Sequence, residues 1–205
     1  MEFFRVFDRW RANASRLAAV SATALLLVGC GGGAAKNDTF DLSAVPAIDG
    51  PSSTSRQILI PEPSALKALN SEQIVIRLTG SEIQYLAASQ WSDRLPRMYQ
   101  QKLVEAFENT GKVGGVGKPG EGLAIDYQII SDIRSFEIST GGADTAIVEI
   151  AVKIVNDRNG SVRAQQVFRA TANVSGAGNP AFIKALDTAS SKVTADIVGW
   201  TLRAI

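Results

Sequence analysis

Residues 123–138, with the sequence LAIDYQIISDIRSFEI, alternate apolar and polar side chains and therefore determine the fold class. The first apolar face of this predicted strand consists of Leu123, Ile125, Tyr127 and Ile129. After Ile133 the parity changes, because Phe136 and Ile138 occupy the alternate positions. Successive side chains of a strand point to opposite faces, so this change of phase predicts a β-bulge or bend near Ile133.

Two further strands and a helix follow. Apolar side chains alternate over 148–154, and a strand is expected from 162 to about 174. Between them, residues 157–160 (DRNG) have the composition of a hairpin turn. Asn179 and Pro180 then predict the capped start of a final helix, whose apolar stripe ends at Trp200.

Upstream of this stretch, short β-rich runs occur at 58–60 and 74–78, with a weaker one at 82–89. From Ser92 the apolar period becomes helical, and Gly111 is the expected end of that helix. The order of elements predicts an α+β fold with two layers: a mixed, mostly antiparallel sheet with two helices packed on one face.

Composition excludes several classes of function. The chain has 205 residues, 45% of them hydrophobic, a net charge of +1, no histidine and one cysteine. A neutral charge argues against nucleic acid as a partner. Without histidine, the Ser-His-Asp and Cys-His nucleophiles and the commonest metal ligand are missing. We therefore predict no catalytic, cofactor-binding or metal-binding residues and no enzymatic activity.

Residues 115–120 (GVGKPG) match the G-x-G-x-x-G pattern of dinucleotide-binding loops. That pattern needs a strand before it and a helix after it, whereas here a helix precedes and a strand follows. A P-loop is also excluded, because Pro119 stands where Ser or Thr is required. We predict a flexible connection and no nucleotide binding.

Acidic side chains are scattered along the predicted strands and helices, at Asp93, Glu105, Glu108, Asp126, Asp132, Glu137, Asp144, Glu149 and Asp157. Most are expected to be solvated. A hydrolase that uses carboxylates alone is an open alternative, and it would need two carboxyl groups within roughly 5–10 Å in a cleft.

The N-terminal residues have the pattern of a secretory signal peptide. Arginines in residues 1–16 precede an uncharged, largely apolar run of 12 residues, 17–28, which is shorter than the roughly 20 residues of a membrane-spanning helix. The run ends in Val28-Gly29-Cys30, which resembles a bacterial lipobox. We predict a signal peptide over 1–29 and lipidation of Cys30, and Gly31 after the cysteine favours the outer membrane.

Residues 31–56 are rich in Gly, Ala, Ser, Asp and Pro and show no apolar period. We predict that 30–56 form the lipidated cysteine and a flexible tether, whose root-mean-square span is roughly 25–30 Å. The folded domain is expected over 57–205.

Aromatic residues stand out before the first predicted helix: Tyr85, and Trp91 in the stretch Trp91-Ser92-Asp93-Arg94-Leu95-Pro96. They are interpreted chiefly as packing at the helix start, with Ser92 or Asp93 capping the first turn. Exposure of Trp91 at a partner-binding surface is the alternative, because tryptophan is enriched at interface hot spots.

At these residues the sequence resembles the ABC-type transport auxiliary lipoprotein family over about residues 40–203. Phe40-Asp41-Leu42 stands where the family has Tyr-x-Leu. Tyr85 followed by Trp91 to Pro96 matches its Tyr and Trp-Ala/Ser-Asp-x-Leu-Pro signature, and the segment 134–137 is also similar.

The resemblance implies a non-enzymatic accessory of an MCE-type system that moves phospholipid or other apolar cargo. It implies an MCE-domain protein of an inner-membrane ABC transporter as partner, an outer-membrane lipoprotein facing the periplasm, and a candidate interface at Tyr85, Trp91, Asp93, Leu95 and Pro96. Self-association into a homo-oligomer is left open. The alternative function is an outer-membrane lipoprotein that regulates a periplasmic enzyme, such as a peptidoglycan synthase.

Overall fold

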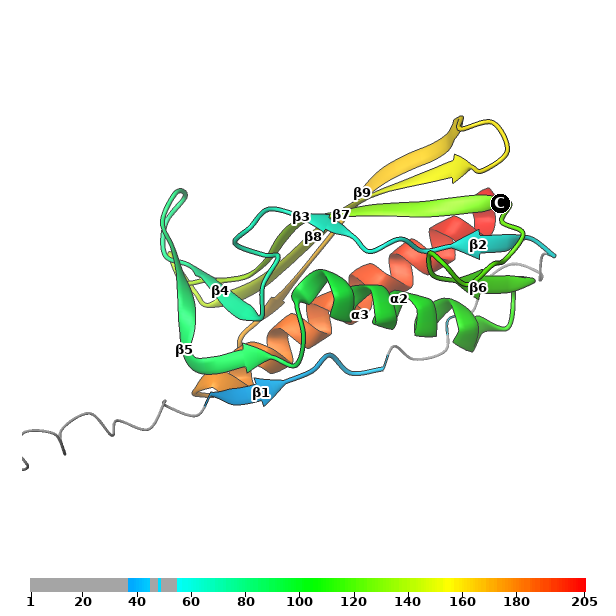
Figure 1. Ribbon diagram of the computed structural model, residues 1–205. Helices are drawn as coiled ribbons and strands as arrows, with labels where there is room; N and C mark the ends of the chain where they lie inside the picture. Colours follow the sequence, from blue (N-terminus) through cyan, green and yellow to red (C-terminus); the bar gives the residue numbers. More distant parts are fainter. Residues whose placement is uncertain (1–36, 45–47, 49–54) are drawn as a thin grey trace, which may run out of the picture. The chain divides into compact units, whose positions relative to one another are not determined.

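The computed structural model describes residues 37–44, 48 and 55–205 (Figure 1). The predicted signal peptide and Cys30 lie outside the described residues. The strands are β1 Asp38–Phe40, β2 Gln57–Leu59, β3 Ser64–Ala65, β4 Gln73–Arg77, β5 Ile83–Trp91, β6 Gly115–Gly117, β7 Tyr127–Ser139, β8 Thr145–Asn156 and β9 Val162–Asn173. The helices of the described part are α2 Leu95–Thr110 and α3 Asn179–Ala204.

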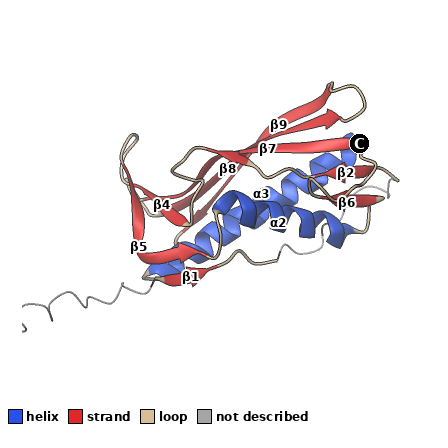
Figure 2. Ribbon diagram, in the orientation of Figure 1, coloured by secondary structure: helices blue, strands red, loops and turns tan. Residues whose placement is uncertain are grey.

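The predicted α+β class is confirmed. All the strands named above join one mixed sheet, and α2 and α3 lie side by side on one face of it (Figure 2). The long pairings are antiparallel: β7 with β8 and β8 with β9. The parallel pairings are short, and the most extensive of them join only three residue pairs.

Strand β7 organises the sheet. Along one edge it pairs with β8 over nearly its whole length. Along the other edge three short strands follow one another in chain order, all parallel to β7: β2, β3 and β4. The segment from Gln57 to Arg77 therefore runs along β7 as an interrupted strand.

The predicted change of phase in β7 is confirmed. The ladder between β7 and β8 shifts register between Ile133 and Ser135. Tyr127, Ile129 and Ile133 before the shift are buried on the helix-facing side, and so are Phe136 and Ile138 after it. The expected turn at 157–160 joins β8 to β9, as predicted.

The core lies between this face of the sheet and the two helices. Strand β8 contributes every second residue, namely Ala146, Val148, Ile150, Val152 and Ile154. The two helices are joined by a buried hydrogen bond of 3.0 Å between the hydroxyls of Tyr99 and Thr194. Burial of Tyr99 raises the pKa of its phenol, so the hydroxyl is neutral.

The helix ends are partly as predicted. Helix α2 has Pro96 in its first turn, and Gly111 ends it with a φ of 59°, a left-handed conformation that glycine adopts without steric cost. At α3 the prediction was wrong: Gly178 is the N-cap residue, and the side chain of Asn179 does not cap the helix. Its amide instead donates to the carbonyl of Ala87 and to the hydroxyl of Ser89, both in β5.

Three short strands differ from the sequence-based expectation. The compact unit begins at Asn37 and includes β1, whereas the sequence predicted a tether up to residue 56. Strand β6 lies within the glycine-rich segment that was expected to be a flexible connection, and it pairs with β2. Strand β3 was not expected. Each has only two or three residues, which is too short for an apolar period to appear.

Candidate functional site

The segment that carries the family signature is mainly structural. Trp91 is 1% exposed, and its ring meets that of Phe136 edge to face at 5.8 Å between centroids. Leu95 and Pro96 are buried in the first turn of α2. The Asp93 carboxylate accepts a hydrogen bond from the backbone N–H of Arg94 at 2.7 Å. The predicted capping of α2 by Ser92 or Asp93 was wrong, because Arg94 is the N-cap residue and no side chain caps the helix.

Tyr85 differs from these residues because its side chain is 42% exposed. It lies with Ile83, 36% exposed, in the first half of β5, which forms the β4–β5 hairpin. Residues 83 and 85 fall on one face of the strand, since side chains alternate. The hairpin therefore presents two large apolar side chains to its surroundings.

A bulge separates this half of β5 from the half that enters the core. The pair Gln73–Gln90 is followed along the ladder by the pair Val75–Tyr85. Between these two pairs the chain of β4 moves by two residues and that of β5 by five, so the extra residues bulge out of β5. Ala88, within the bulge, has a φ of 54°, which is uncommon for a residue other than glycine. The amide of Asn179 is hydrogen-bonded at this bend, at 2.9 Å to the Ala87 carbonyl and 2.7 Å to the Ser89 hydroxyl.

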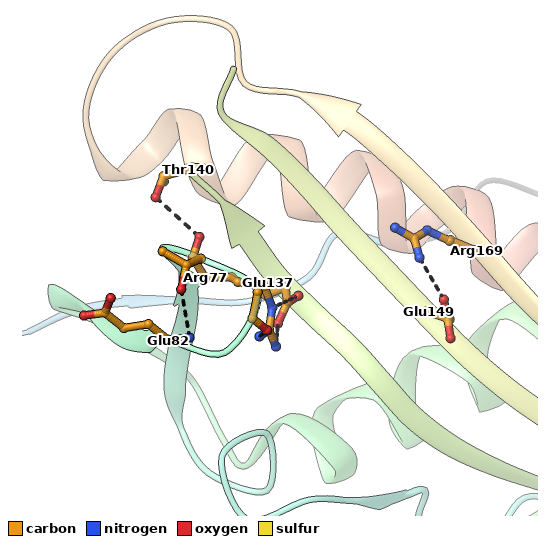
Figure 3. Close-up of polar contacts among 8 residues, drawn as sticks. Arg77, Glu82, Glu137, Thr140, Glu149 and Arg169 are labelled. Carbon is orange, nitrogen blue, oxygen red and sulfur yellow. Dashed lines mark hydrogen bonds and ion pairs between the residues drawn. The ribbon is translucent and has the colours of Figure 1, made fainter. Parts of the chain in front are cut away.

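The turn end of the hairpin is held by an ion pair between Arg77 of β4 and Glu137 of β7 (Figure 3). The guanidinium donates to both carboxylate oxygens, at 2.6 and 2.8 Å, and also to the carbonyl of Gly80. Hydrogen bonding to Glu137 raises the pKa of Arg77 above its already high ordinary value. The Glu137 side chain is buried, so the pair attaches the hairpin rigidly to the centre of the sheet.

A second exposed region is the sheet face opposite the helices, over β7, β8 and β9. Two adjoining hollows of about 340 and 250 Å³ share Arg134, Ala151 and Lys153 as lining residues. Val167 of β9 is 45% exposed and lies opposite Ala151. Within the described residues, Lys153 has no ion pair and the outer edge of β9 has no strand partner.

A polar cavity of about 440 Å³ lies beside the first half of α2. Its Lys102 ammonium is 3.7 Å from Asp41 and 3.8 Å from Glu105, so the positive charge is balanced. Among the described residues, no three His, Cys, Asp or Glu side chains are grouped so that they could hold a metal ion. Arginine partners also engage Asp126, Glu137 and Glu149.

The hydrogen bonds of Asp126 tie together the start of β2 and the turn after β8. Its carboxylate accepts from the backbone N–H of Gln57 at 3.1 Å and lies 3.3 Å from both Arg56 and Arg158. The hydrogen bond from Gln57, with the two arginines, lowers the pKa of Asp126 below its ordinary value.

The segment before β2 also contacts the folded unit. Leu42 is buried in the core, and the backbone N–H of Ser43 donates to Asp187 of α3 at 2.7 Å. Ile48 lines a groove with Phe168 and Trp200. No helix in the described ranges is long and apolar enough to cross a membrane.

Sequence reasoning missed Ile83, Asn179 and Glu137 as residues that shape the exposed hairpin. Ile83 was placed within a weak strand, but its exposure follows from the bulge, which no local pattern predicts. Asn179 was taken as a helix cap. Glu137 carried no signal, because alternation places it on the face opposite Phe136 and Ile138, where a carboxylate is expected to be solvated.

Comparison with known proteins gives the following relationships. The sequence profile of the ABC-type transport auxiliary lipoprotein component matches residues 40–198. The uncharacterized protein bll6063 of Bradyrhizobium diazoefficiens is 28% identical over 98% of this chain, and the chain spans about half (55%) of that relative's length.

Solved structures show a similar fold. The crystal structure of protein XCC0632 from Xanthomonas campestris matches with a TM-score of 0.75 and 26% identity, over 82% of this chain and 96% of that one. The hypothetical protein CT253 from Chlamydia trachomatis matches with a TM-score of 0.54 and 7% identity, over 74% of this chain and 98% of that one, which shows the fold alone.

Proposed function

The chain belongs to the ABC-type transport auxiliary lipoprotein family, and we propose that it serves an MCE-type ABC system as a non-catalytic accessory held at the outer membrane through Cys30. The cargo of such a system would be phospholipid or another apolar molecule. The observation that carries this proposal is the short distance along the chain between the lipobox cysteine and the first strand of the family domain.

Only eight residue steps separate Cys30 from Asp38, where β1 begins. A fully extended chain covers at most about 3.6 Å per residue, so lipidation of Cys30 would keep Asp38 within about 29 Å of the anchor. Two or three acyl chains on one residue suffice for stable membrane attachment. The folded unit would therefore work beside the membrane and meet a partner arriving from the periplasm.

The surface best suited to that partner is the region of β9 and the open sheet face. The edge of β9, over residues 162–173, is available for strand addition in the described part of the fold. An unpaired edge presents a row of backbone donors and acceptors to another chain. Val167 and the unpaired Lys153 add an apolar and a cationic contact beside it.

Photo-crosslinking in intact cell envelopes tests this assignment. A photoreactive amino acid at position Val167 is expected to crosslink to an MCE-domain protein. The control is the same amino acid at Leu66, an exposed apolar residue outside β9, which is expected to give no such product.

Each other outcome contradicts a part of the proposal. Crosslinks only between copies of this chain would assign the β9 edge to a homo-oligomer. Crosslinks to a peptidoglycan synthase would support the enzyme-regulating alternative. No product from position 167 would rule out this surface as the docking site.

A further inference from the structure

We propose that the β4–β5 hairpin rests on the bilayer that anchors the protein, with Ile83 and Tyr85 in the membrane interface. This inference rests on the lipid attachment of Cys30 in the proposed function. It adds a second, non-covalent contact with the membrane, made by the folded unit itself.

The direction of β1 supports this placement. Strand β1 runs parallel to β5, with Asp38 opposite Ser89. Asn37, the residue before Asp38, therefore lies at the end of β1 that faces the residues preceding Ser89, which are those of the hairpin. Ile83 is six residues from Ser89, at most about 20 Å along an extended strand. The hairpin is thus within the reach of the eight-step connection to Cys30.

The chemistry of the hairpin suits the interface of a bilayer. Isoleucine supplies an apolar surface, and tyrosine combines an apolar ring with a hydroxyl that remains hydrated, which is why tyrosine is enriched at membrane interfaces. Residues 78–85 (LTGSEIQY) contain Glu82 and no lysine or arginine. Beside the turn, the charge of Arg77 is engaged by Glu137. The contact is therefore apolar and gains nothing from anionic lipid.

The hairpin is also held in a defined position. The Arg77–Glu137 pair fixes its turn end, and Asn179 fixes the bend at Ala87 and Ser89. A rigid projection loses little conformational freedom when it meets a surface, so even two apolar side chains can contribute to the contact.

Tryptophan fluorescence on vesicles tests the proposal. Residues 30–205, which include the whole compact unit, are coupled through Cys30 to a maleimide lipid in phosphatidylcholine vesicles. Emission is compared with and without brominated phosphatidylcholine. For Tyr85→Trp, most of the emission added over the wild-type background of Trp91 and Trp200 is expected to be quenched. Val162→Trp, at an exposed apolar position in β9, is the matched control and should retain its added emission.

Loss of quenching at position 85, or equal quenching at positions 85 and 162, would overturn the proposal. Ile83→Trp provides a second reporter if Tyr85→Trp unfolds at a lower urea concentration than the wild type. Replacing part of the phosphatidylcholine by phosphatidylglycerol should leave the quenching unchanged, and an increase would indicate electrostatic adsorption instead.

This result is independent of the transport role. The maleimide lipid replaces natural acylation, and no partner protein is present. Quenching at position 85 without crosslinking at position 167 would leave the membrane contact standing and reject the docking surface. Crosslinking at position 167 without quenching at position 85 would support the docking surface and reject the membrane contact.

Discussion

The sheet has two halves that are stabilised in different ways. In the β7–β9 half, apolar side chains alternate regularly and pack against α3, as the fully buried Val148 and Ile150 illustrate. In the β4–β5 half, most of residues 83–88 are exposed and the strand is bent. Strand β4 and the end of β5 are anchored by burial of Ile74, Ile76 and Trp91. The exposed residues 83–88 instead depend on pairing with β4 and on the hydrogen bonds of Arg77 and Asn179. Burial thus builds the scaffold, and directional hydrogen bonds help to position its exposed segment.

The largest expected effect comes from the side chain that joins the two halves. Trp91 of β5 is buried against Phe136 of β7. Trp91→Ala should lower the free energy of unfolding by about 3–5 kcal/mol, through lost burial and the cavity left behind. Urea unfolding followed by circular dichroism measures it. Tyr85→Ala, at an exposed position of the same strand, should change the free energy of unfolding by no more than about 0.5 kcal/mol. Equal losses for the two variants would contradict the distinction between the buried and the exposed part of β5.

The buried ion pair comes next. Glu137→Gln leaves Arg77, 32% exposed, without its carboxylate partner, and should cost about 1–3 kcal/mol in urea unfolding. Glu149→Gln is the matched control on the neighbouring strand, where Arg169 is 56% exposed (Figure 3). That exposed pair should contribute about 0–1 kcal/mol. If both variants lose a similar free energy of unfolding, burial of Glu137 does not determine how much the Arg77–Glu137 pair contributes.

The contact at the bend should have a smaller and more local effect. Asn179→Ala removes hydrogen bonds to Ala87 and Ser89 and should lower the free energy of unfolding by about 1–2 kcal/mol. Amide hydrogen exchange should accelerate around residues 86–90 more than in β8. The exposed Asn173→Ala serves as the control. Unchanged exchange at the bend would mean that Asn179 does not hold the hairpin.

The smallest effect concerns Asp126, in the regular half. Its pKa is lowered in the folded state, so its contribution to stability is complete above the ordinary pKa and is lost as the pH falls through the folded value. Asp126→Asn should therefore lower the urea midpoint at neutral pH, and the difference from the wild type should narrow below about pH 4. A constant difference across this range would exclude the carboxylate charge as its source.

The same division explains what could be predicted from sequence. The alternation from Tyr127 to Ile138, its phase shift at Ile133 and the helix ending at Gly111 are local patterns, and the structure confirms them. The expected start of this strand at Leu123 was wrong, because β7 begins at Tyr127 and Leu123 is exposed. Strands β1, β3 and β6 have no local signal, because their partners lie far along the chain. Burial of Trp91 and exposure of Tyr85 depend on the bend between them. Two aromatic residues of one motif thus have opposite environments that composition could not distinguish.

The sharing of one edge of β7 among three short strands has a consequence for how the molecule assembles. Ile58, Ser64 and Val75 each pair with a residue more than 60 positions later in the chain. During synthesis these early segments have no partner until β7 has been synthesised. Strands β7, β8 and β9, in contrast, are joined by short turns and can pair with one another as soon as they are made. We therefore expect the order of assembly to run opposite to the order of synthesis, with the C-terminal meander as the template onto which the earlier strands are added last.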